Sequence, residues 1–210
     1  MSEPLLQAVN LQCERDDRML FRDLSFSILP GTVTRVEGPN GSGKTTLLRI
    51  LAGLSDAERG ELFWQGAPRE RQREDFLHNM LYLGHRPGIK SLLTPVENLR
   101  ALMAGRKAVN DAMLFQALAG TGLAGFEDVP CRRLSAGQQR RVALARLLIA
   151  DEPLWILDEI FTAIDIDGVE ALENLLVQRA RDGGAIVVTT HHDLKLPSMQ
   201  SITLGGGDGR

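Results

Sequence analysis

The chain has 210 residues, of which 43% are hydrophobic and 24% charged, and that length suits one domain with a sizeable core rather than two independent units. Its net charge of −3 excludes the broad basic excess that attracts nucleic acid. The two cysteines, Cys13 and Cys131, show no CxxC or Cys/His spacing, so the sequence indicates neither a zinc site nor a disulfide framework and favours buried apolar side chains.

The N-terminal region has the pattern of short strands. Candidate strands lie at about residues 5–13, 24–29 and 61–65, with Gly60 and Gly66 as punctuation, and they predict a small antiparallel layer. The opening MSEPLLQAVNLQCERDD lacks the basic start and apolar stretch of a secretory signal. No run in the sequence reaches the roughly 18 apolar residues of a membrane helix. We therefore expect a cytoplasmic protein that reaches a membrane only through partners.

A glycine-rich segment follows a short apolar-rich run at residues 33–37 and precedes a helical pattern of leucines, so that GxxxxGK[ST] lies between an expected strand and an expected helix. There, backbone N–H groups can surround phosphate oxygens, Lys44 supplies a cation and the hydroxyl of Thr45 offers a ligand to Mg²⁺. The alternative is a plain strand-to-helix turn, although the string arises by chance in roughly one in a hundred chains of this length. The predicted nucleotide-binding residues are Gly38, Pro39, Asn40, Gly41, Ser42, Gly43, Lys44, Thr45 and Thr46, and the predicted cofactors are ATP and Mg²⁺.

The middle of the chain is expected to be helical. At TPVENL, Thr94 can cap a helix, Pro95 suits its first position and Glu97 completes a capping box. A second helix is expected at about residues 111–120.

The segment LSAGQQRRVALARLL has two compatible interpretations. Ser135 to Gln138 fit a capping box that opens an amphipathic helix. The free N–H groups of such a helix start also favour an anion, so the same segment can bind the γ-phosphate held by a second subunit.

Two acids end the apolar run LWILDE. Adjacent acids at the carboxyl end of a buried strand are costly unless they meet a cation or act in catalysis. Asp158 suits Mg²⁺ ligation and Glu159 suits polarising an attacking water, the alternative being a solvated strand end. The nearby pair Asp151 and Glu152 follows a helix and precedes Pro153, so we interpret it as a turn.

The end of the chain completes a parallel α/β pattern. A helix at about residues 169–181 separates LWILDE from AIVVTTH, and both apolar runs are typical of strands buried on two faces. The tail GGGDGR is expected to be disordered.

The ordered motifs GPNGSGKT, LSAGQQRR, LWILDE, FTAID and TTH together resemble the nucleotide-binding domain of the ATP-binding-cassette (ABC) superfamily over nearly the whole chain. The resemblance implies a single α/β P-loop domain over residues 1–210, with a mixed core sheet, a small antiparallel layer and a helical subdomain inserted at about residues 87–150. It also implies a head-to-tail dimer with ATP between the loop of one subunit and the signature of the other. The signature residues acting in trans would be Ser135, Ala136, Gly137 and Gln138.

Further roles come from the same resemblance. Asp165 would lie in the loop that links the two sites, and His191 would contact the γ-phosphate and position water beside the catalytic Glu159. From the residues alone, His191 can equally be a polar side chain that ends a buried strand, and His192 keeps that interpretation.

Four positions depart from the family pattern. His85 stands where the family usually has a glutamine, and it can bind water or the metal shell. Arg15 replaces an aromatic that stacks on adenine, so it either stacks on the base through its planar guanidinium or is a solvent-facing charge. Ala136 replaces a glycine and Ile160 a proline, with small effects expected.

Within the superfamily, the stretches QCERDD, LFWQG, LGHRPGIKSLLTPVENL, LAGFEDVP and WILDEIFTAID are similar to ATP-binding subunits of cytochrome c maturation systems. That similarity implies a homodimer at the cytoplasmic face of the bacterial inner membrane, docked to integral CcmB-like and CcmC-like subunits, whose ATP hydrolysis serves haem export or release of a haem chaperone. No residue pattern identifies haem itself. The alternatives are the ATPase of another ABC transporter and a soluble ABC ATPase without a transport role.

Overall fold

The computed structural model describes residues 3–162, 164, 166–192, 194 and 199–205. The chain divides into two compact units. The core unit comprises Met1–Tyr82, Glu152–Glu159 and Glu173–Arg210, and the helical unit comprises Leu83–Asp151 and Ile160–Leu172. None of the helices in the described ranges has the length and apolarity that crossing a bilayer requires. The predicted single-domain organisation, with a helical insertion at about 87–150, stays a prediction.

The first sheet of the core unit is antiparallel and has the strand order β2-β1-β4-β5. Its strands are β1 (Leu6–Arg15), β2 (Arg18–Ile28), β4 (Arg59–Trp64) and β5 (Ala67–Pro68). The predicted antiparallel layer is therefore confirmed. The predicted second strand was too short, because a two-residue turn at Asp16 and Asp17 returns the chain at once and β2 begins at Arg18.

Gly60 is part of a strand, not punctuation before one as predicted. It lies in β4 with φ 92°, and a Cβ there would come within 2.5 Å of the carbonyl oxygen of Asn10 on β1. The residue is glycine because two backbones approach closely at an irregularity in the β1–β4 register. Gly66, in contrast, lies in the turn after β4, as predicted.

The second sheet has the order β6-β7-β8-β3-β9. Its strands are β3 (Val33–Glu37), β6 (Met80–Leu83), β7 (Leu154–Asp158), β8 (Ala185–Thr189) and β9 (Met199–Thr203). The pairs β7–β8, β8–β3 and β3–β9 are parallel, and every residue of β7 and β8 is buried, as the two apolar runs predicted. The carboxyl ends of β3, β7 and β8 meet at one edge of this sheet.

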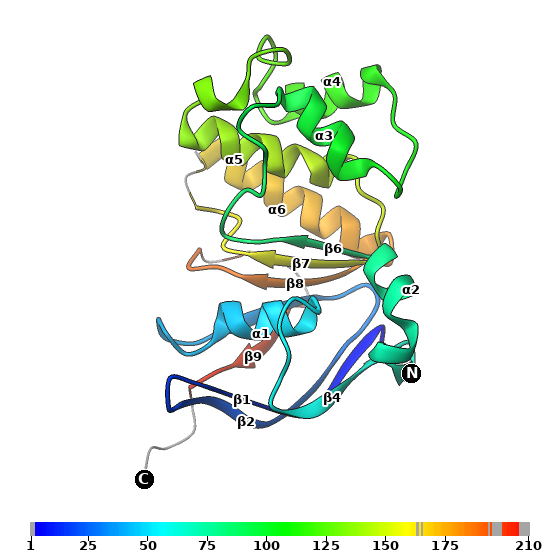
Figure 1. Cartoon of the computed structure of the whole chain (residues 1–210), viewed down its shortest axis with the longest axis vertical. Helices are drawn as coiled ribbons and strands as arrows, with labels where there is room; N and C mark the ends of the chain where they lie inside the picture. Colours follow the sequence, from blue (N-terminus) through cyan, green and yellow to red (C-terminus); the bar gives the residue numbers. More distant parts are fainter. Residues whose placement is uncertain (1–2, 163, 165, 193, 195–198, 206–210) are drawn as a thin grey trace. The chain divides into compact units, whose positions relative to one another are not determined.

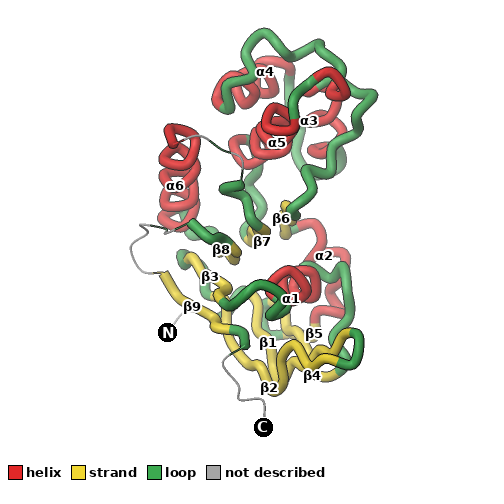
Figure 2. Tube along the Cα trace, turned by 90° about the vertical axis from the view of Figure 1, so that its left-hand side faces the viewer, coloured by secondary structure: helices red, strands yellow, loops and turns green. Residues whose placement is uncertain are grey.

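Helix α1 (Lys44–Leu51) lies between the two sheets (Figures 1 and 2). Its buried face consists of Leu47, Leu48, Ile50 and Leu51, and it joins side chains of both sheets in one core cluster. The short α2 (Arg73–His78) adds Phe76 to this cluster. Because the apolar stripe of α1 is held on both sides, its N-terminus is fixed at the end of β3.

The helical unit contains α3 (Pro95–Met103), α4 (Asp111–Gly120) and α5 (Ala136–Ala145), which share a separate apolar cluster. The predicted capping boxes are present: Thr94 and Glu97 open α3, and Ser135 and Gln138 open α5. Helix α6 (Ile166–Arg181) contributes its first residues to this unit and the rest to the core unit. The predictions for these helices are confirmed, with α6 beginning three residues earlier than expected.

The remaining local predictions concern small features. Both cysteines are buried and free, as expected, and burial raises the pKa of the Cys13 and Cys131 thiols. Residues 150–153 lie outside any helix or strand, which agrees with the turn interpretation of the first acid pair. The tail from residue 206 lies outside the described residues.

Candidate functional site

Glycine shapes the loop between β3 and α1. Gly38, Gly41 and Gly43 have φ values of 146°, 79° and 96°. A Cβ on Gly38 would lie 2.6 Å from both the carbonyl oxygen of Leu204 and Oγ of Ser42, so a larger residue would force the loop open. The loop is therefore held in a narrow turn that only glycine allows at these points.

The start of α1 offers free donors. Gly43 is the N-cap in a left-handed conformation without a side-chain cap, and the first turn carries no acid. Within the described chain, the N–H groups from Gly43 to Thr46 donate to no acceptor, whereas the next N–H, at Leu47, bonds the Gly43 carbonyl at 2.8 Å. Free N–H groups and the helix dipole favour an anion at this position.

Lys44 adds a cation to the same place. Its Nζ donates to the carbonyl oxygens of Gly38 at 2.7 Å and Pro39 at 3.1 Å, so the side chain folds back over the loop. An ammonium held in this way stands beside the free N–H groups and favours a group with several negative charges, such as a polyphosphate.

A buried carboxylate faces the helix start from β7. Asp158 is 1% exposed, and its Oδ1 accepts from Oγ1 of Thr45 at 3.3 Å and from Oγ1 of Thr189 at 2.6 Å. Its charge also raises the pKa of the phenol of Tyr82, although burial of that phenol is the larger cause. A carboxylate beside a threonine hydroxyl is an oxygen donor set of the kind that Mg²⁺ prefers, completed by phosphates and water.

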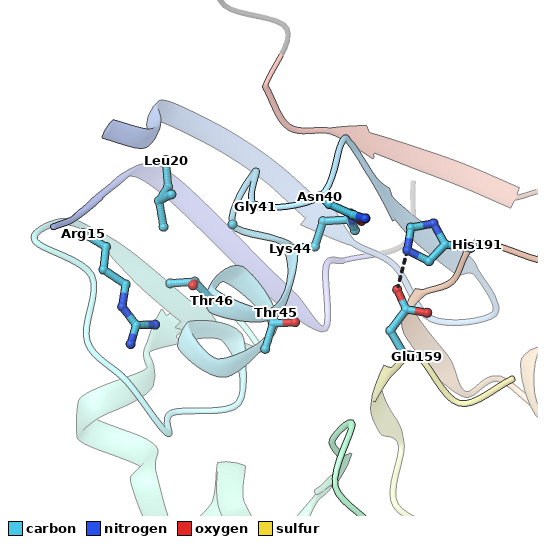
Figure 3. Close-up of a pocket in the computed structure, with 10 residues that line it drawn as sticks. Arg15, Leu20, Asn40, Gly41, Lys44, Thr45, Thr46, Glu159 and His191 are labelled. Atoms are coloured by element: carbon cyan, nitrogen blue, oxygen red, sulfur yellow. Dashed lines mark ion pairs between the residues drawn. The ribbon is translucent and has the colours of Figure 1, made fainter. Parts of the chain in front are cut away.

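The backbone of Glu159 is anchored to Thr189 by hydrogen bonds. It has a positive φ of 53°, and its N–H donates to both the carbonyl oxygen and Oγ1 of Thr189, at 3.1 and 3.0 Å. Its side chain is 19% exposed, and Oε1 lies 3.4 Å from Nε2 of His191, whose side chain is 65% exposed (Figure 3). The two side chains therefore form a pair at the edge of the sheet, one anchored and one accessible.

Thr189 is a site residue that the sequence interpretation missed. It is fully buried at the end of β8, and its single hydroxyl bonds both Asp158 and the N–H of Glu159. The available signal was a threonine that ends an apolar run next to a histidine, but only the pairing of β7 with β8 brings it to the acids.

These features meet in one pocket of about 320 Å³ (Figure 3). Its lining consists of Arg15, Leu20, Asn40, Gly41, Gly43, Lys44, Thr45, Thr46, Glu159 and His191. Nine of these ten were candidates from the sequence, and Leu20 is the addition. All belong to the core unit. The pocket thus joins an anion cradle to a carboxylate–imidazole pair.

The sequence of the chain matches a known family. A family model described as "ABC transporter" matches residues 21–162. The chain belongs to the ABC transporter family. The match includes the glycine-rich loop, the α5 start and the adjacent acids Asp158, which ends β7, and Glu159, which follows it.

Relatives at high identity carry one common name. The chain is 57% identical over 203 residues to the "Cytochrome c biogenesis ATP-binding export protein CcmA" of Hahella chejuensis, covering 96% of each chain. It is 55% identical over 190 residues to the protein of that name from Yersinia pestis, covering 90% of this chain and 87% of the relative. For the Vibrio cholerae protein of that name, identity is 51% over 204 residues, covering 96% and 99%.

Solved structures of the family share the fold. One, an ATP-binding subunit of an ABC transporter, has a TM-score of 0.78 at 25% identity, covering 89% of this chain and 79% of its own. Another is the dimeric ATP-binding cassette MJ0796 bound to ADP and Pi in a post-hydrolysis state. It has a TM-score of 0.76 at 24% identity, covering 89% and 88%, and supports the fold alone.

Other predicted site residues of this ABC chain lie outside the pocket lining. Ser135 and Ala136 are exposed at the start of α5, where Ser135 Oγ accepts from Gln138 N–H at 3.2 Å and Gln138 Oε1 accepts from Ser135 N–H at 2.9 Å. Gly137 follows in the first turn. These residues belong to the helical unit, so their meeting with a nucleotide stays a prediction.

His85 is exposed in the helical unit, and its backbone is held from α5. Arg140, 5% exposed, donates through Nη1 to the carbonyl oxygens of Gly84 at 2.8 Å and His85 at 2.9 Å. In the described ranges, no three histidine, cysteine, aspartate or glutamate side chains gather as a metal cluster. The predicted metal role of His85 stays a prediction, and Asp165 lies outside the described residues.

Proposed function

We propose that this chain is the ATP-binding and ATP-hydrolysing subunit of an ABC transporter complex that serves cytochrome c biogenesis. The observation that carries the enzymatic part is the pocket in which the free N–H groups of the α1 start and Lys44 face the Glu159–His191 pair. The relatives named as cytochrome c biogenesis export proteins, at 51–57% identity over nearly whole chains, support the biological role.

In the proposed mechanism, the phosphates of ATP bind along the loop and the first turn of α1. The N–H groups from Gly43 to Thr46 and the Nζ of Lys44 would donate hydrogen bonds to these phosphates and hold them in the pocket. When bound, Mg²⁺ would neutralise phosphate charge, and Thr45 and Asp158 are the residues that would hold it.

Glu159 acts as the general base in this proposal. Its backbone is fixed by two bonds to Thr189, so its carboxylate has few orientations and lies beside the open pocket. It would take a proton from the attacking water, while His191, 3.4 Å away, orients that water toward the γ-phosphate. Hydrolysis yields ADP and phosphate. The hydroxyl of Thr189 positions both acids without touching substrate.

A second copy of the chain would complete each site. The exposed start of α5, with Ser135, Ala136, Gly137 and Gln138 at its first turn, offers an anion site to a partner's γ-phosphate. In this dimer Asp165 would lie in the loop that links the two sites. His85 would link the nucleotide state to a partner. Arg15, which lines the pocket, would contact the base.

The proposed assembly lies at the cytoplasmic face of the bacterial inner membrane. There the dimer would dock as a peripheral subunit on integral CcmB-like and CcmC-like partners. ATP hydrolysis would then drive haem export or the release of a haem chaperone.

A complementation experiment tests this proposal. In a bacterium deleted for its own homologue, the wild-type chain should restore covalent haem in c-type cytochromes, measured by haem staining of membrane proteins. Lys44→Ala should fail to do so, whereas Arg22→Ala, at an exposed position of β2 outside the pocket, should succeed. Equal restoration by Lys44→Ala would refute the role of the phosphate site, and no restoration by the wild type would refute the biological role.

A further inference from the structure

The end of the pocket opposite Glu159 and His191 is formed by Arg15 and Leu20 (Figure 3). We propose that this end binds guanine and hypoxanthine at least as well as adenine, with Arg15 setting the preference, so that GTP is a substrate beside ATP. The inference rests on the proposed nucleotide-binding function and adds the class of base to it.

A tight hairpin holds Arg15 at this place. β1 ends at Arg15 and β2 begins at Arg18, which is its register partner, and the two residues between them, Asp16 and Asp17, have φ values of 53° and 57°. Two positive φ values in a two-residue loop are typical of a type I′ turn, whose twist matches that of the paired strands. The backbone of Arg15 is therefore fixed although its side chain is exposed.

The hairpin end also lies against the phosphate loop. The Nη1 of Arg18 is 3.7 Å from the point where a Cβ on Gly41 would lie, and the Cβ of Leu20 is 3.0 Å from the corresponding point on Gly43. A nucleotide with its phosphates on the loop therefore extends its sugar and base toward this hairpin, where Arg15 lines the pocket.

The wall at this end has an unusual composition for a base site. None of the ten residues that line the pocket is phenylalanine, tyrosine or tryptophan, and the imidazole of His191 lies at the opposite end. The apolar contact at this end comes from Leu20. In the described part of the chain, the guanidinium of Arg15 makes no hydrogen bond or ion pair, so its N–H donors are available to a ligand. The guanidinium of Arg15, which can donate hydrogen bonds but cannot accept them, is therefore the group that would recognise polar atoms of the base.

The two purine bases differ in what they offer to such a group. Guanine presents O6 and N7, two acceptors side by side, which match the fork of an arginine. Adenine presents N7 but replaces O6 with the N6 amino donor, which opposes a second N–H. Stacking of the guanidinium plane is equally open to both bases. Hydrogen bonding by Arg15 therefore favours guanine, while the loop binds the phosphates of either nucleotide.

Calorimetric titration of the full chain with nucleoside diphosphates and Mg²⁺ tests the inference without hydrolysis. ADP, GDP and IDP are compared, because hypoxanthine keeps O6 and N7 but lacks the 2-amino group of guanine. We expect GDP and IDP to bind with dissociation constants no higher than that of ADP. Weaker binding of either one beyond that limit overturns the proposal. If none of the three binds, the nucleotide-binding function itself is refuted.

Variants identify the residue responsible. Arg15→Lys keeps the charge but loses the fork, so the ratio of GDP to ADP affinity should fall roughly tenfold. Arg22→Lys is the matched control, since Arg22 is exposed on β2 and does not line the pocket, and it should leave the ratio unchanged. An Arg15→Lys ratio within twofold of wild type, with ADP binding retained, would remove Arg15 from base selection.

Discussion

Thr189 connects the two acidic residues of the site through one buried hydroxyl. Oγ1 donates to Oδ1 of Asp158 at 2.6 Å and accepts from the N–H of Glu159 at 3.0 Å. Thr189→Val keeps the shape of the side chain and removes both bonds. A hydrogen bond to a charged group contributes about 1.5–3 kcal/mol. The N–H of Glu159 is not left without an acceptor in the variant, because it still donates to the carbonyl oxygen of Thr189 at 3.1 Å. We therefore expect the free energy of unfolding to fall by about 2 kcal/mol.

The same substitution should affect turnover more than binding. The phosphate loop does not depend on Thr189, so KM for ATP should stay within about threefold of wild type. Loss of the anchor lets the carboxylate of Glu159 reorient, and a misplaced base lowers kcat by roughly 10- to 100-fold. Urea unfolding without nucleotide measures the first effect, and release of phosphate at saturating ATP measures the second.

Thr34→Val is the matched control. Thr34 is 1% exposed on β3 of the same sheet, and its hydroxyl makes no hydrogen bond within the described residues. Its replacement should leave kcat unchanged and stability unchanged or raised, because an unpaired buried hydroxyl is unfavourable. Equal losses in both variants, or wild-type stability and kcat in Thr189→Val, would refute the reasoning.

Further predictions concern the charges of the site. Lys44→Ala should weaken ATP binding by roughly tenfold or more in calorimetry, because it removes a charge-assisted contact. Glu159→Gln should bind ATP like wild type but hydrolyse it roughly 10²- to 10⁴-fold more slowly, and wild-type turnover would exclude Glu159 as the base. Ser135→Arg should block the nucleotide site of the partner copy in the dimer. Full ATPase activity in mixed dimers of wild-type and Ser135→Arg chains would therefore contradict a site shared between two copies. The chain has a single tyrosine, Tyr82, so absorbance near 295 nm isolates its titration. Burial, and next the charge of Asp158, raise the pKa of Tyr82 from its ordinary value of 10.0, so the neutral phenol stabilises the fold. That stabilisation is lost as the pH rises from about 10 through the pKa of the folded state. Asp158→Asn should lower the midpoint of the tyrosine titration.

Local patterns determined most of the elements that surround the site. The apolar run 33–37, the glycine pattern and the leucines of α1 lie in one continuous segment, so strand, loop and helix were predictable together. The capping boxes of α3 and α5 were predictable for the same reason, since both partners lie three residues apart. The burial of β7 and β8 followed from their uninterrupted apolar composition.

Elements that depend on a partner strand were not predictable. β6 is only four residues long, and β9 has three exposed polar residues among five, so neither has a periodic pattern of its own. Both are strands because a neighbouring strand supplies their hydrogen bonds. The early start of β2 and the glycine within β4 likewise depend on close pairing with β1.

The sequence by itself determined which residue types serve the site, namely the glycines of the phosphate loop, Lys44, Thr45 and the adjacent acids Asp158 and Glu159. Only the tertiary structure decided how they act together. Thr45 and Asp158 are 113 positions apart, and Thr189 is 31 positions from Asp158, yet one carboxylate oxygen bonds both hydroxyls. The reason is that parallel strands bring their carboxyl ends to one edge of a sheet, and strand order, unlike helix periodicity, depends on contacts between distant segments.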